Sequence, residues 1–212
     1  MPALKPTSSR TEPDSTLDYY EAHARDYAEG TLGIDMGDLY DRFLSYIPRG
    51  GRILDAGSGS GRDTLAFLAK GYQVEAFDAS PALAKLSSQL TGVHTEVIRF
   101  QDFHSGPRFD GVWAIASLLH VPRGQLPDAV RRLIDALKPS GALFISVKLG
   151  DGERVAKDGR LFTDLDESAV RRLLKPFQME IKEVWISEGQ GSRQGKDRWL
   201  NALALKGAGH ES

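Results

Sequence analysis

The fold of this chain is decided by the stretch RILDAGSGSGRD, residues 52–63. Apolar residues that favour a β-strand lead to Asp55, and a loop follows in which Gly57, Gly59 and Gly61 alternate with serines. A helical pattern begins directly after this loop. A strand, a tight glycine turn and a helix N-terminus together bring backbone N–H groups close to a nucleotide-like ligand.

A second acidic residue, Asp78, ends the next predicted strand, about 20 residues after the loop, where such folds place a ribose-binding carboxylate. A dinucleotide-binding loop would carry its third glycine at position 62, which is an arginine here. The Asp55 carboxylate would repel a pyrophosphate and would suit a ligand with an ammonium or sulfonium group. The alternative is that the glycines serve only a tight turn that packs the strand against the helix.

The composition suits one domain with a full core. The chain has 212 residues, of which 41% are hydrophobic and 26% charged. The net charge of −2 gives no argument for binding nucleic acid or an anionic membrane. There is no cysteine, which excludes disulfides and thiolate metal sites and fits a cytoplasmic location. We predict no metal site.

The two ends differ from the rest of the chain. Residues 1–16 carry three prolines among serines and threonines and lack the apolar core of a signal peptide, so we predict a flexible tail. Residues 207–212 are also predicted to be a tail. No run approaches the ~20 apolar residues that cross a bilayer. Between the tails we predict one domain, with a helical lid at 17–47, a cofactor-binding half at 48–150 and a substrate-side half at 151–206.

Hydrophobic periodicity and breaker residues predict alternating helices and strands. The predicted helices span 17–29, 38–47, 63–70, 81–90, 125–137 and 166–175. The predicted strands span 52–56, 72–77, 95–100, 111–116, 142–147, 178–187 and 199–205. Strands separated by helices imply a parallel sheet covered on both faces. The last two strands, joined by a polar hairpin loop, should pair antiparallel. We therefore predict a single Rossmann-like α/β/α domain with a seven-stranded, mostly parallel sheet. The charge-rich segment 150–162 is predicted to be a solvated loop or a flap over the substrate.

Five short motifs extend this pattern along the chain. They are LDAGSGSG at 54–61, FDAS at 77–80, QDF at 101–103, FDGVW at 109–113 and LKPSG at 137–141. In this order they resemble the motifs of class I S-adenosylmethionine-dependent methyltransferases, and the resemblance runs from Tyr19 to Leu205. The residues around Gly61 and Gly71 are similar to the tellurite-resistance type within that family, but we infer no tellurite activity from them.

The resemblance implies that S-adenosylmethionine is the cofactor and S-adenosylhomocysteine the product. The residues then expected to bind the cofactor are Tyr27, Asp55, Ala56, Gly57, Ser58, Gly59, Gly61, Asp78, Ala79, Gln101, Asp102, Phe103, Ala116 and Ser117. Asp55 would bind the ammonium group or orient the loop, Asp78 would accept the ribose hydroxyls, and Asp102 would accept from the adenine amino group. The alternatives are a helix-capping role for Asp78 and a plain loop position for Asp102.

Two residue types are candidates for catalysis. His120 follows the fourth strand, and a histidine that titrates near neutrality suits a general base. Its alternative role is a loop histidine held by a backbone contact. Tyr20 and Tyr27 lie seven residues apart on one helical face, where they would fold over the cofactor as a lid with a tyrosine oxygen near the methyl group. Ordinary core packing is the alternative for this pair.

Three residues are candidates for the substrate side: Arg62, Trp113 and Lys148. Arg62 stands where the glycine loop enters its helix, and Lys148 follows the fifth strand, whose carboxyl end faces the ligand crevice of such folds. Both are suited to hold an anionic acceptor, although solvated surface charges are the alternative.

The expected reaction is in-line transfer of a methyl group to a small-molecule acceptor. The Asn/Asp-Pro-Pro-aromatic signature of nucleic-acid amino methyltransferases is absent, because residues 114–117 read AIAS. The lack of cysteine excludes a cysteine adduct on cytosine. We expect no membrane or nucleic-acid partner and a monomer or homodimer. A protein or tRNA acceptor, or a non-catalytic S-adenosylmethionine-binding protein, remains an alternative. Arg62 counts against an NAD-dependent oxidoreductase.

Overall fold

The computed structural model describes residues 15–192 and 195–208, and a seven-stranded sheet forms its centre. The strands are β1 (Arg52–Ala56), β2 (Gln73–Asp78), β3 (Thr95–Val97), β4 (Phe109–Ile115), β5 (Leu137–Lys148), β8 (Met179–Ser192) and β9 (Gly195–Lys206). Their order across the sheet is β3-β2-β1-β4-β5-β9-β8. The first five strands pair in parallel, and β9 is antiparallel to both β5 and β8. The predicted Rossmann-like fold and its antiparallel last strand are confirmed.

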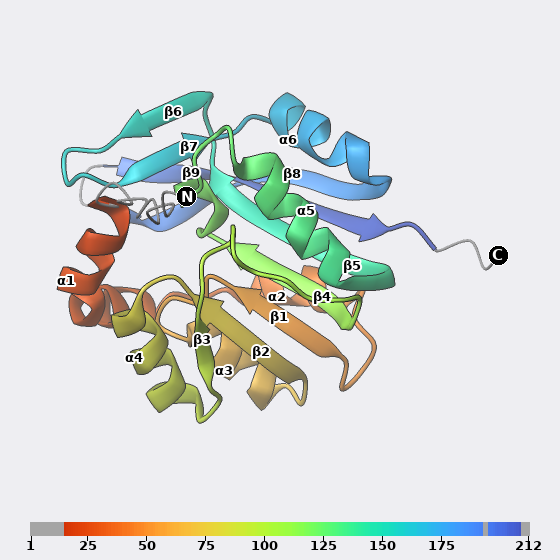
Figure 1. The fold of residues 1–212 in the computed structure, drawn as a ribbon, viewed down its shortest axis with the longest axis horizontal. Helices are drawn as coiled ribbons and strands as arrows, with labels where there is room; N and C mark the ends of the chain where they lie inside the picture. The colour runs from red at the N-terminus through yellow and green to blue at the C-terminus, as the bar shows by residue number, and fades with distance from the viewer. Residues whose placement is uncertain (1–14, 193–194, 209–212) are drawn as a thin grey trace, which may run out of the picture.

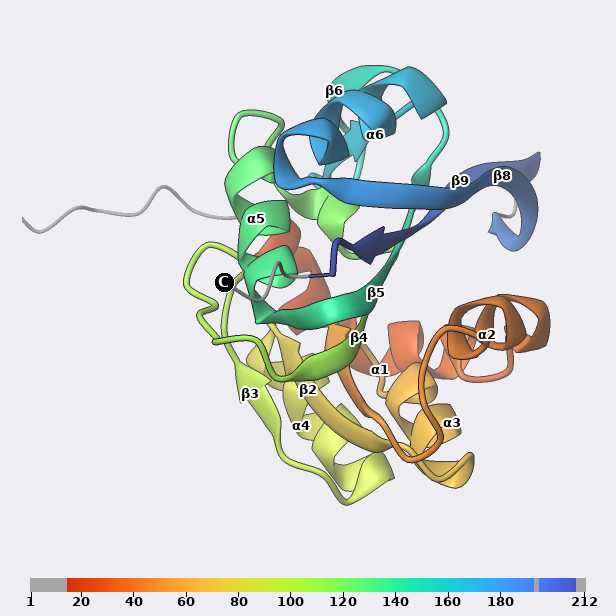
Figure 2. The ribbon, with the colours of Figure 1, turned by 90° about the vertical axis from the view of Figure 1, so that its right-hand side faces the viewer.

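Helices cover both faces of this sheet. They are α1 (Ser15–Thr31), α2 (Gly37–Leu44), α3 (Arg62–Ala69), α4 (Pro81–Thr91), α5 (Leu126–Ala136) and α6 (Glu167–Leu174). In Figure 2 the sheet is seen nearly edge-on, with α2 and α3 on one side and α5 and α6 on the other. The start of α4 follows its sequence signals, since the Ser80 side chain accepts a hydrogen bond from the Leu83 N–H and Pro81 occupies the first turn.

The core divides between the two faces because side chains alternate along a strand. Leu54 and Val112 join the cluster under α5 and α6, whereas their neighbours Ile53 and Trp113 join the cluster under α2 and α3. Trp113 stacks on Phe144 there, with 4.2 Å between ring centroids. Aromatic pairs of this kind contribute about 0.5–1.5 kcal/mol beyond their buried area.

Some boundaries differ from the sequence prediction. Residues 1–14 and 209–212 lie outside the described residues, while Ser15 and Thr16, predicted to end a tail, begin α1. The segment predicted as a loop or flap forms an antiparallel hairpin of β6 (Gly152–Val155) and β7 (Leu161–Asp164). Much of the hairpin loop predicted between the last two strands belongs to the longer strands β8 and β9, where Gly189 pairs with Asp197. In both cases the strand is stabilised by pairing with a neighbouring strand, which the local sequence pattern does not reveal.

Within the described ranges, none of the helices has the length and apolar character needed to cross a membrane. The helices that position the site are seen in Figure 1, where α1 lies between α4 and the β6–β7 hairpin.

Candidate functional site

A cavity of about 430 Å³ opens at the carboxyl ends of β1, β2 and β4. Strand order reverses between β1 and β4, and open α/β sheets bind ligands at such a switch point. The volume lies in the range of small-molecule sites, about 300–1,000 Å³. The predicted site residues that line this cavity are Tyr20, Tyr27, Gly57, Gly59, Asp78, Ala79, Gln101, Ala116, Ser117 and His120.

The glycine loop forms one wall of the cavity. Gly57 and Gly59 have φ of +79° and +55°, conformations that side-chain-bearing residues rarely adopt. A Cβ on Gly57 would lie 2.4 Å from Cβ of Ser117, and one on Gly59 would lie 3.2 Å from the Tyr27 ring. Gly61 does not line the cavity. A Cβ there would lie 2.9 Å from the Cα of Ser87, so Gly61 serves close packing against α4.

Asp78 joins this loop to the end of β2. One carboxylate oxygen accepts a hydrogen bond from the Gly59 N–H at 2.8 Å, and the other accepts from the Ser80 N–H at 2.9 Å. Burial raises the pKa of Asp78 to about 6, against the lowering effect of these two N–H groups. Each oxygen of an ionised carboxylate has a second lone pair, so Asp78 retains capacity to accept hydroxyl groups from a ligand in the cavity.

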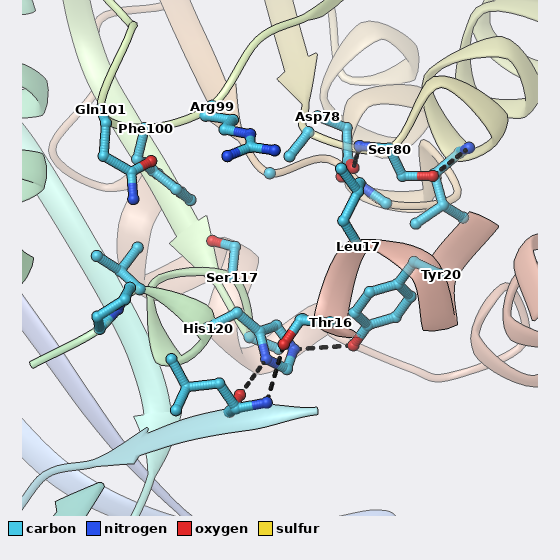
Figure 3. Close-up of a pocket in the computed structure, with 18 of the residues that line it drawn as sticks. Thr16, Leu17, Tyr20, Asp78, Ser80, Arg99, Phe100, Gln101, Ser117 and His120 are labelled. Carbon is cyan, nitrogen blue, oxygen red and sulfur yellow. Dashed lines mark hydrogen bonds between the residues drawn. The ribbon is translucent and has the colours of Figure 1, made fainter. Parts of the chain in front are cut away.

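Tyr20 and His120 form the opposite side of the cavity (Figure 3). His120 Nδ1 lies 2.7 Å from the carbonyl oxygen of Leu161, which only accepts, so Nδ1 carries the proton of the neutral imidazole. Nε2 is then an acceptor, and it receives the Tyr20 O–H at 2.8 Å. Burial raises the pKa of Tyr20, and the nearby Arg160 guanidinium opposes that rise. His120 thus makes the backbone contact that the sequence analysis gave as its alternative role, and it also lines the cavity.

Helix α1 covers one side of the cavity and is hydrogen-bonded to the elements on both sides of it. The Ser15 hydroxyl donates to the Gly159 carbonyl at 2.6 Å, and Thr16 Oγ1 accepts from the Leu161 N–H at 2.9 Å. On the other side, the Glu21 carboxylate accepts from the Ala82 N–H at 3.0 Å and from the Ser80 hydroxyl. Tyr27 is part of this cover, with its ring edge-on to Tyr20 at a centroid distance of 5.2 Å. In contrast, α2 of the predicted lid buries Tyr40 and Phe43 against the sheet.

Several predicted cofactor residues do not line the cavity. Those outside the lining are Asp55, Ala56, Ser58, Gly61, Asp102 and Phe103. Asp55 is 1% exposed, accepts the Thr64 hydroxyl at 2.6 Å, and has its pKa raised to about 8 by burial and by the neighbouring charge of Asp63. Phe103 stacks on Phe77, so its ring packs in the core behind the residues that line the cavity. The Ser58 hydroxyl is buried without a hydrogen-bond partner among the described residues.

The three predicted substrate residues lie outside the cavity lining. Trp113 is fully buried and donates its indole N–H to Asp63 at 3.0 Å, so the expectation that it faces the substrate is corrected. Arg62 makes two hydrogen bonds to the same carboxylate, at 2.7 Å and 3.0 Å. Lys148 is paired with Asp197 at 3.1 Å. These side chains are occupied by structural partners.

Other cavity residues escaped the sequence analysis. They are Thr16, Leu17, Ser80, Leu83, Arg99, Phe100, Val121, Pro122, Gln125 and Leu161. Arg99 and Phe100 enter because β3 ends at Val97, before the predicted end of that strand, and the following loop turns into the site. Ala116 carries a signal that only coordinates show, a φ of +50° at the end of β4. Within the described ranges, His, Asp and Glu side chains form no cluster suited to a metal ion.

The cavity fits a nucleoside-containing cofactor. Gly57 and Gly59 line the cavity, Asp78 has acceptor capacity, and the Ser58 hydroxyl beside them has no partner in the described part of the chain. The Phe100 and Gln101 side chains lie along the same edge as Asp78, away from Tyr20 and His120 (Figure 3). The aromatic ring of Phe100 suits a flat base, and the carboxylate of Asp78 suits ribose hydroxyls, which together are the groups of an adenosine.

Comparison with known proteins agrees with this geometry. The family model described as a methyltransferase domain matches residues 25–185. Curated relatives include an uncharacterised methyltransferase of Staphylococcus carnosus, 26% identical over 108 residues (51% of this chain, 52% of that protein). Another is a ubiquinone biosynthesis O-methyltransferase of Xanthomonas axonopodis pv. citri, 36% identical over 107 residues (47% of this chain, 44% of that protein). The chain therefore spans about half the length of these relatives.

Solved structures show the same fold. The 1,6-didemethyltoxoflavin-N1-methyltransferase of Burkholderia thailandensis has a TM-score of 0.72 and 24% identity, covering 90% of this chain and 85% of that one. A TehB-like methyltransferase of Corynebacterium glutamicum has a TM-score of 0.66 and 21% identity, covering 87% of this chain and 98% of that one. With the family match over most of its length, the chain belongs to the methyltransferase-domain family, and it shares the fold of these solved methyltransferases.

Proposed function

We propose that the protein transfers a methyl group from S-adenosylmethionine to a small-molecule acceptor by in-line displacement. The observation that carries the proposal is one cavity with two chemically distinct sides. Asp78 and the glycine loop offer acceptors and backbone donors on one side, and the Tyr20–His120 pair lies on the other.

Each side has a proposed role. Asp78 would hold the ribose hydroxyls, and the Gly57–Gly59 backbone would contact the amino-acid part of the cofactor. Gln101 would lie at the adenine, and Ala116 and Ser117 would border the methionine chain. When bound, the cofactor supplies a methyl group already activated on a sulfonium. The protein then has to position the nucleophile, which accounts for roughly 7–11 kcal/mol of barrier lowering in well-oriented reactions.

A small acceptor is favoured by the helix that covers part of the cavity. Helix α1 is bonded to α4 and to the β6–β7 hairpin, so the cavity is a compartment of about 430 Å³ beneath a helix. Among the similar proteins, one is an O-methyltransferase of ubiquinone biosynthesis and another holds bound 1,6-didemethyltoxoflavin. A protein or tRNA acceptor would have to reach beneath α1, which makes it the second candidate.

Binding and turnover test the proposal separately. S-adenosylhomocysteine should raise the melting temperature, because a ligand at 100 times its Kd stabilises the native state by about 2.7 kcal/mol. NAD is the matched control and should produce no shift. His120→Ala should lower turnover and leave the affinity for S-adenosylhomocysteine nearly intact. A larger shift with NAD, or no binding of S-adenosylhomocysteine by folded protein, would contradict the proposal.

We also propose a cytoplasmic location, because a chain without cysteine needs no oxidising compartment. A monomer or homodimer is the proposed assembly, and analytical ultracentrifugation with and without S-adenosylhomocysteine checks it.

A further inference from the structure

Arg160 is held firmly beside the cavity. It lies in the turn before β7, where the Asp158 carboxylate accepts from its backbone N–H at 3.2 Å, from Nε at 3.1 Å and from Nη2 at 2.7 Å. The guanidinium carbon lies 4.3 Å from the centroid of the Tyr19 ring. Its side chain is 23% exposed. Asp158 and Tyr19 therefore fix the orientation of the guanidinium group.

The remaining guanidinium nitrogen reaches the Tyr20–His120 pair. Arg160 Nη1 donates to the Tyr20 oxygen at 3.4 Å, a long bond of the kind that tightens when a site is filled. A phenol has one hydrogen and two lone pairs. In Tyr20 the hydrogen goes to His120 Nε2 and one lone pair faces Arg160. One lone pair is left for a hydrogen-bond donor in the cavity that Tyr20 lines.

This arrangement also limits how His120 can act. Its Nδ1–H is bonded to the Leu161 carbonyl, and Nε2 accepts the Tyr20 hydrogen. A methyl acceptor in the cavity can therefore pass a proton to His120 only through the Tyr20 oxygen. The charged and titratable groups around that oxygen are Arg160, Asp78, Tyr19 and Tyr27, and Arg160 opposes the effect of burial on the Tyr20 pKa.

We propose that Tyr20 and His120 form a proton relay, that Arg160 is the positioning residue of this relay, and that the acceptor is a neutral molecule whose nucleophilic atom carries a hydrogen. A phenol, an enol or an N–H heterocycle has this chemistry. The inference rests on the proposed function and names the acceptor class of the same site.

The step balances in protons and charge. The acceptor hydrogen moves to the Tyr20 oxygen while the Tyr20 hydrogen moves to His120 Nε2, so His120 ends as imidazolium and Tyr20 is unchanged. The electron pair of the acceptor atom forms its new bond to the methyl carbon, and the pair of the broken carbon–sulfur bond stays on sulfur. Arg160 stabilises the negative charge that develops on the Tyr20 oxygen between the two transfers.

The test compares two arginines of one hairpin. Arg160→Ala removes the contact to Tyr20, and Arg160→Lys keeps a donor there. Arg154→Ala is the matched control, because Arg154 also lies over the Phe162 ring, at 4.5 Å, but is paired with Asp164 and makes no bond to Tyr20. Release of S-adenosylhomocysteine is measured with phenol, 2-naphthol and benzimidazole, and with trimethylamine and dimethyl sulfide as hydrogen-free probes.

We expect turnover with the probes that carry O–H or N–H. Loss of general base catalysis costs about 10²–10⁴-fold, so Tyr20→Phe should lose turnover on that scale. Arg160→Ala should lose about tenfold in kcat with little change in KM, Arg160→Lys should recover part of it, and Arg154→Ala should match the wild type. The loss in Arg160→Ala should shrink as the pH approaches the pKa of the phenol probe, because a phenolate needs no base.

Three results would overturn the inference. One is turnover only with the hydrogen-free probes, or with none of the panel, in protein that binds S-adenosylhomocysteine by calorimetry. Another is an equal kcat loss in Arg160→Ala and Arg154→Ala, or a loss that does not change with pH. The third is a ¹⁵N spectrum of the neutral His120 ring with its proton on Nε2. Failure of S-adenosylhomocysteine to bind the wild type would instead remove the proposed function itself.

Discussion

Two polar clusters near the glycine loop contain similar residues but differ in whether they can still bind a ligand. In the first, the Asp63 carboxylate accepts from Tyr40, from the Trp113 indole and twice from Arg62. An ionised carboxylate has about four lone-pair sites, so this group is saturated. Asp63 is 4% exposed and the cluster joins α2, α3 and β4. It holds the fold together and offers nothing to a ligand.

The second cluster joins Tyr20, His120 and Arg160 at the cavity. It also combines an arginine with a tyrosine, but the Tyr20 oxygen keeps a lone pair on the cavity side of its contacts. Residue type alone therefore does not separate these two clusters. They differ in whether hydrogen-bonding capacity next to a cavity is left unused.

The largest expected effect breaks the saturated cluster. Asp63→Ala leaves the Arg62 guanidinium and two further donors without their acceptor, and removing one partner of a buried ion pair costs about 3–5 kcal/mol. Urea unfolding should show that loss. Asp63→Asn keeps one acceptor and should lose less. Asp128→Ala, which breaks the surface ion pairs of Asp128 with Arg131 and Arg132 on α5, is the control and should leave the unfolding midpoint nearly unchanged. A wild-type midpoint for Asp63→Ala would show that the cluster is dispensable.

The next effect is on binding. Asp78→Ala should weaken S-adenosylhomocysteine by about 1–3 kcal/mol, or roughly 5- to 150-fold, because ligand hydroxyls lose their acceptor. Isothermal titration calorimetry measures it. Glu75→Ala lies on the same strand, paired with Arg108 at the surface, and should leave the affinity unchanged. Equal affinities for the two variants would remove Asp78 from the site.

The pKa of Asp78, about 6, predicts a pH dependence of the same interaction. Hydroxyl donors need the ionised carboxylate, so affinity for S-adenosylhomocysteine should be full above about pH 6 and fall by up to about tenfold per pH unit below it. Its contribution to unfolding has the opposite sign. Because the folded pKa is raised from 3.8, the stabilisation of the uncharged form is present below about pH 4 and lost as the pH rises through about 6.

Calorimetric titrations across this range, with Asp78→Asn as the control, check the prediction. The variant should bind weakly at every pH, and its affinity should be flat between about pH 5 and 7. If the affinity of the wild type for S-adenosylhomocysteine were equally independent of pH, the ionisation of Asp78 would play no part in binding.

The smallest expected loss of stability comes from a conservative change in the first cluster, which can be compared with a matching change in the second. Trp113→Phe removes one donor to Asp63 and should cost about 1 kcal/mol of stability with turnover unchanged. Tyr20→Phe removes one donor to His120 and should change turnover far more than stability. Chemical denaturation and turnover of the same two preparations give the answer. Reduced turnover in fully folded Trp113→Phe would show that the Asp63 cluster also affects catalysis and would contradict this prediction.

The local signals of the sequence predict the sheet and the glycine loop well. Apolar runs, glycines at positive φ and the Ser80–Pro81 cap act within a few residues, and the structure has each of them in place. The β6–β7 hairpin was missed because its charged residues carry no hydrophobic pattern. Contacts from far away, such as Thr16 to Leu161, hold it instead.

The site is only partly readable for the same reason. Trp113 and Val112 alternate across the sheet, and the sequence does not say which face meets the ligand. Arg99 was missed because β3 ended early, which depends on its pairing with β2. The contact from Arg160 to Tyr20 spans 140 residues and arises only when α1 packs beside the hairpin.

Ala116 has a consequence for the position of its neighbour, Ser117. At φ +50° it holds a left-handed conformation that favours glycine, and its N–H is tied to the Ser146 carbonyl at 2.9 Å. Residues held in this way persist only where the surrounding structure over-determines them. A substitution that relaxes this corner would move the neighbouring Ser117, whose hydroxyl is bonded to the Ala56 carbonyl and which lines the cavity.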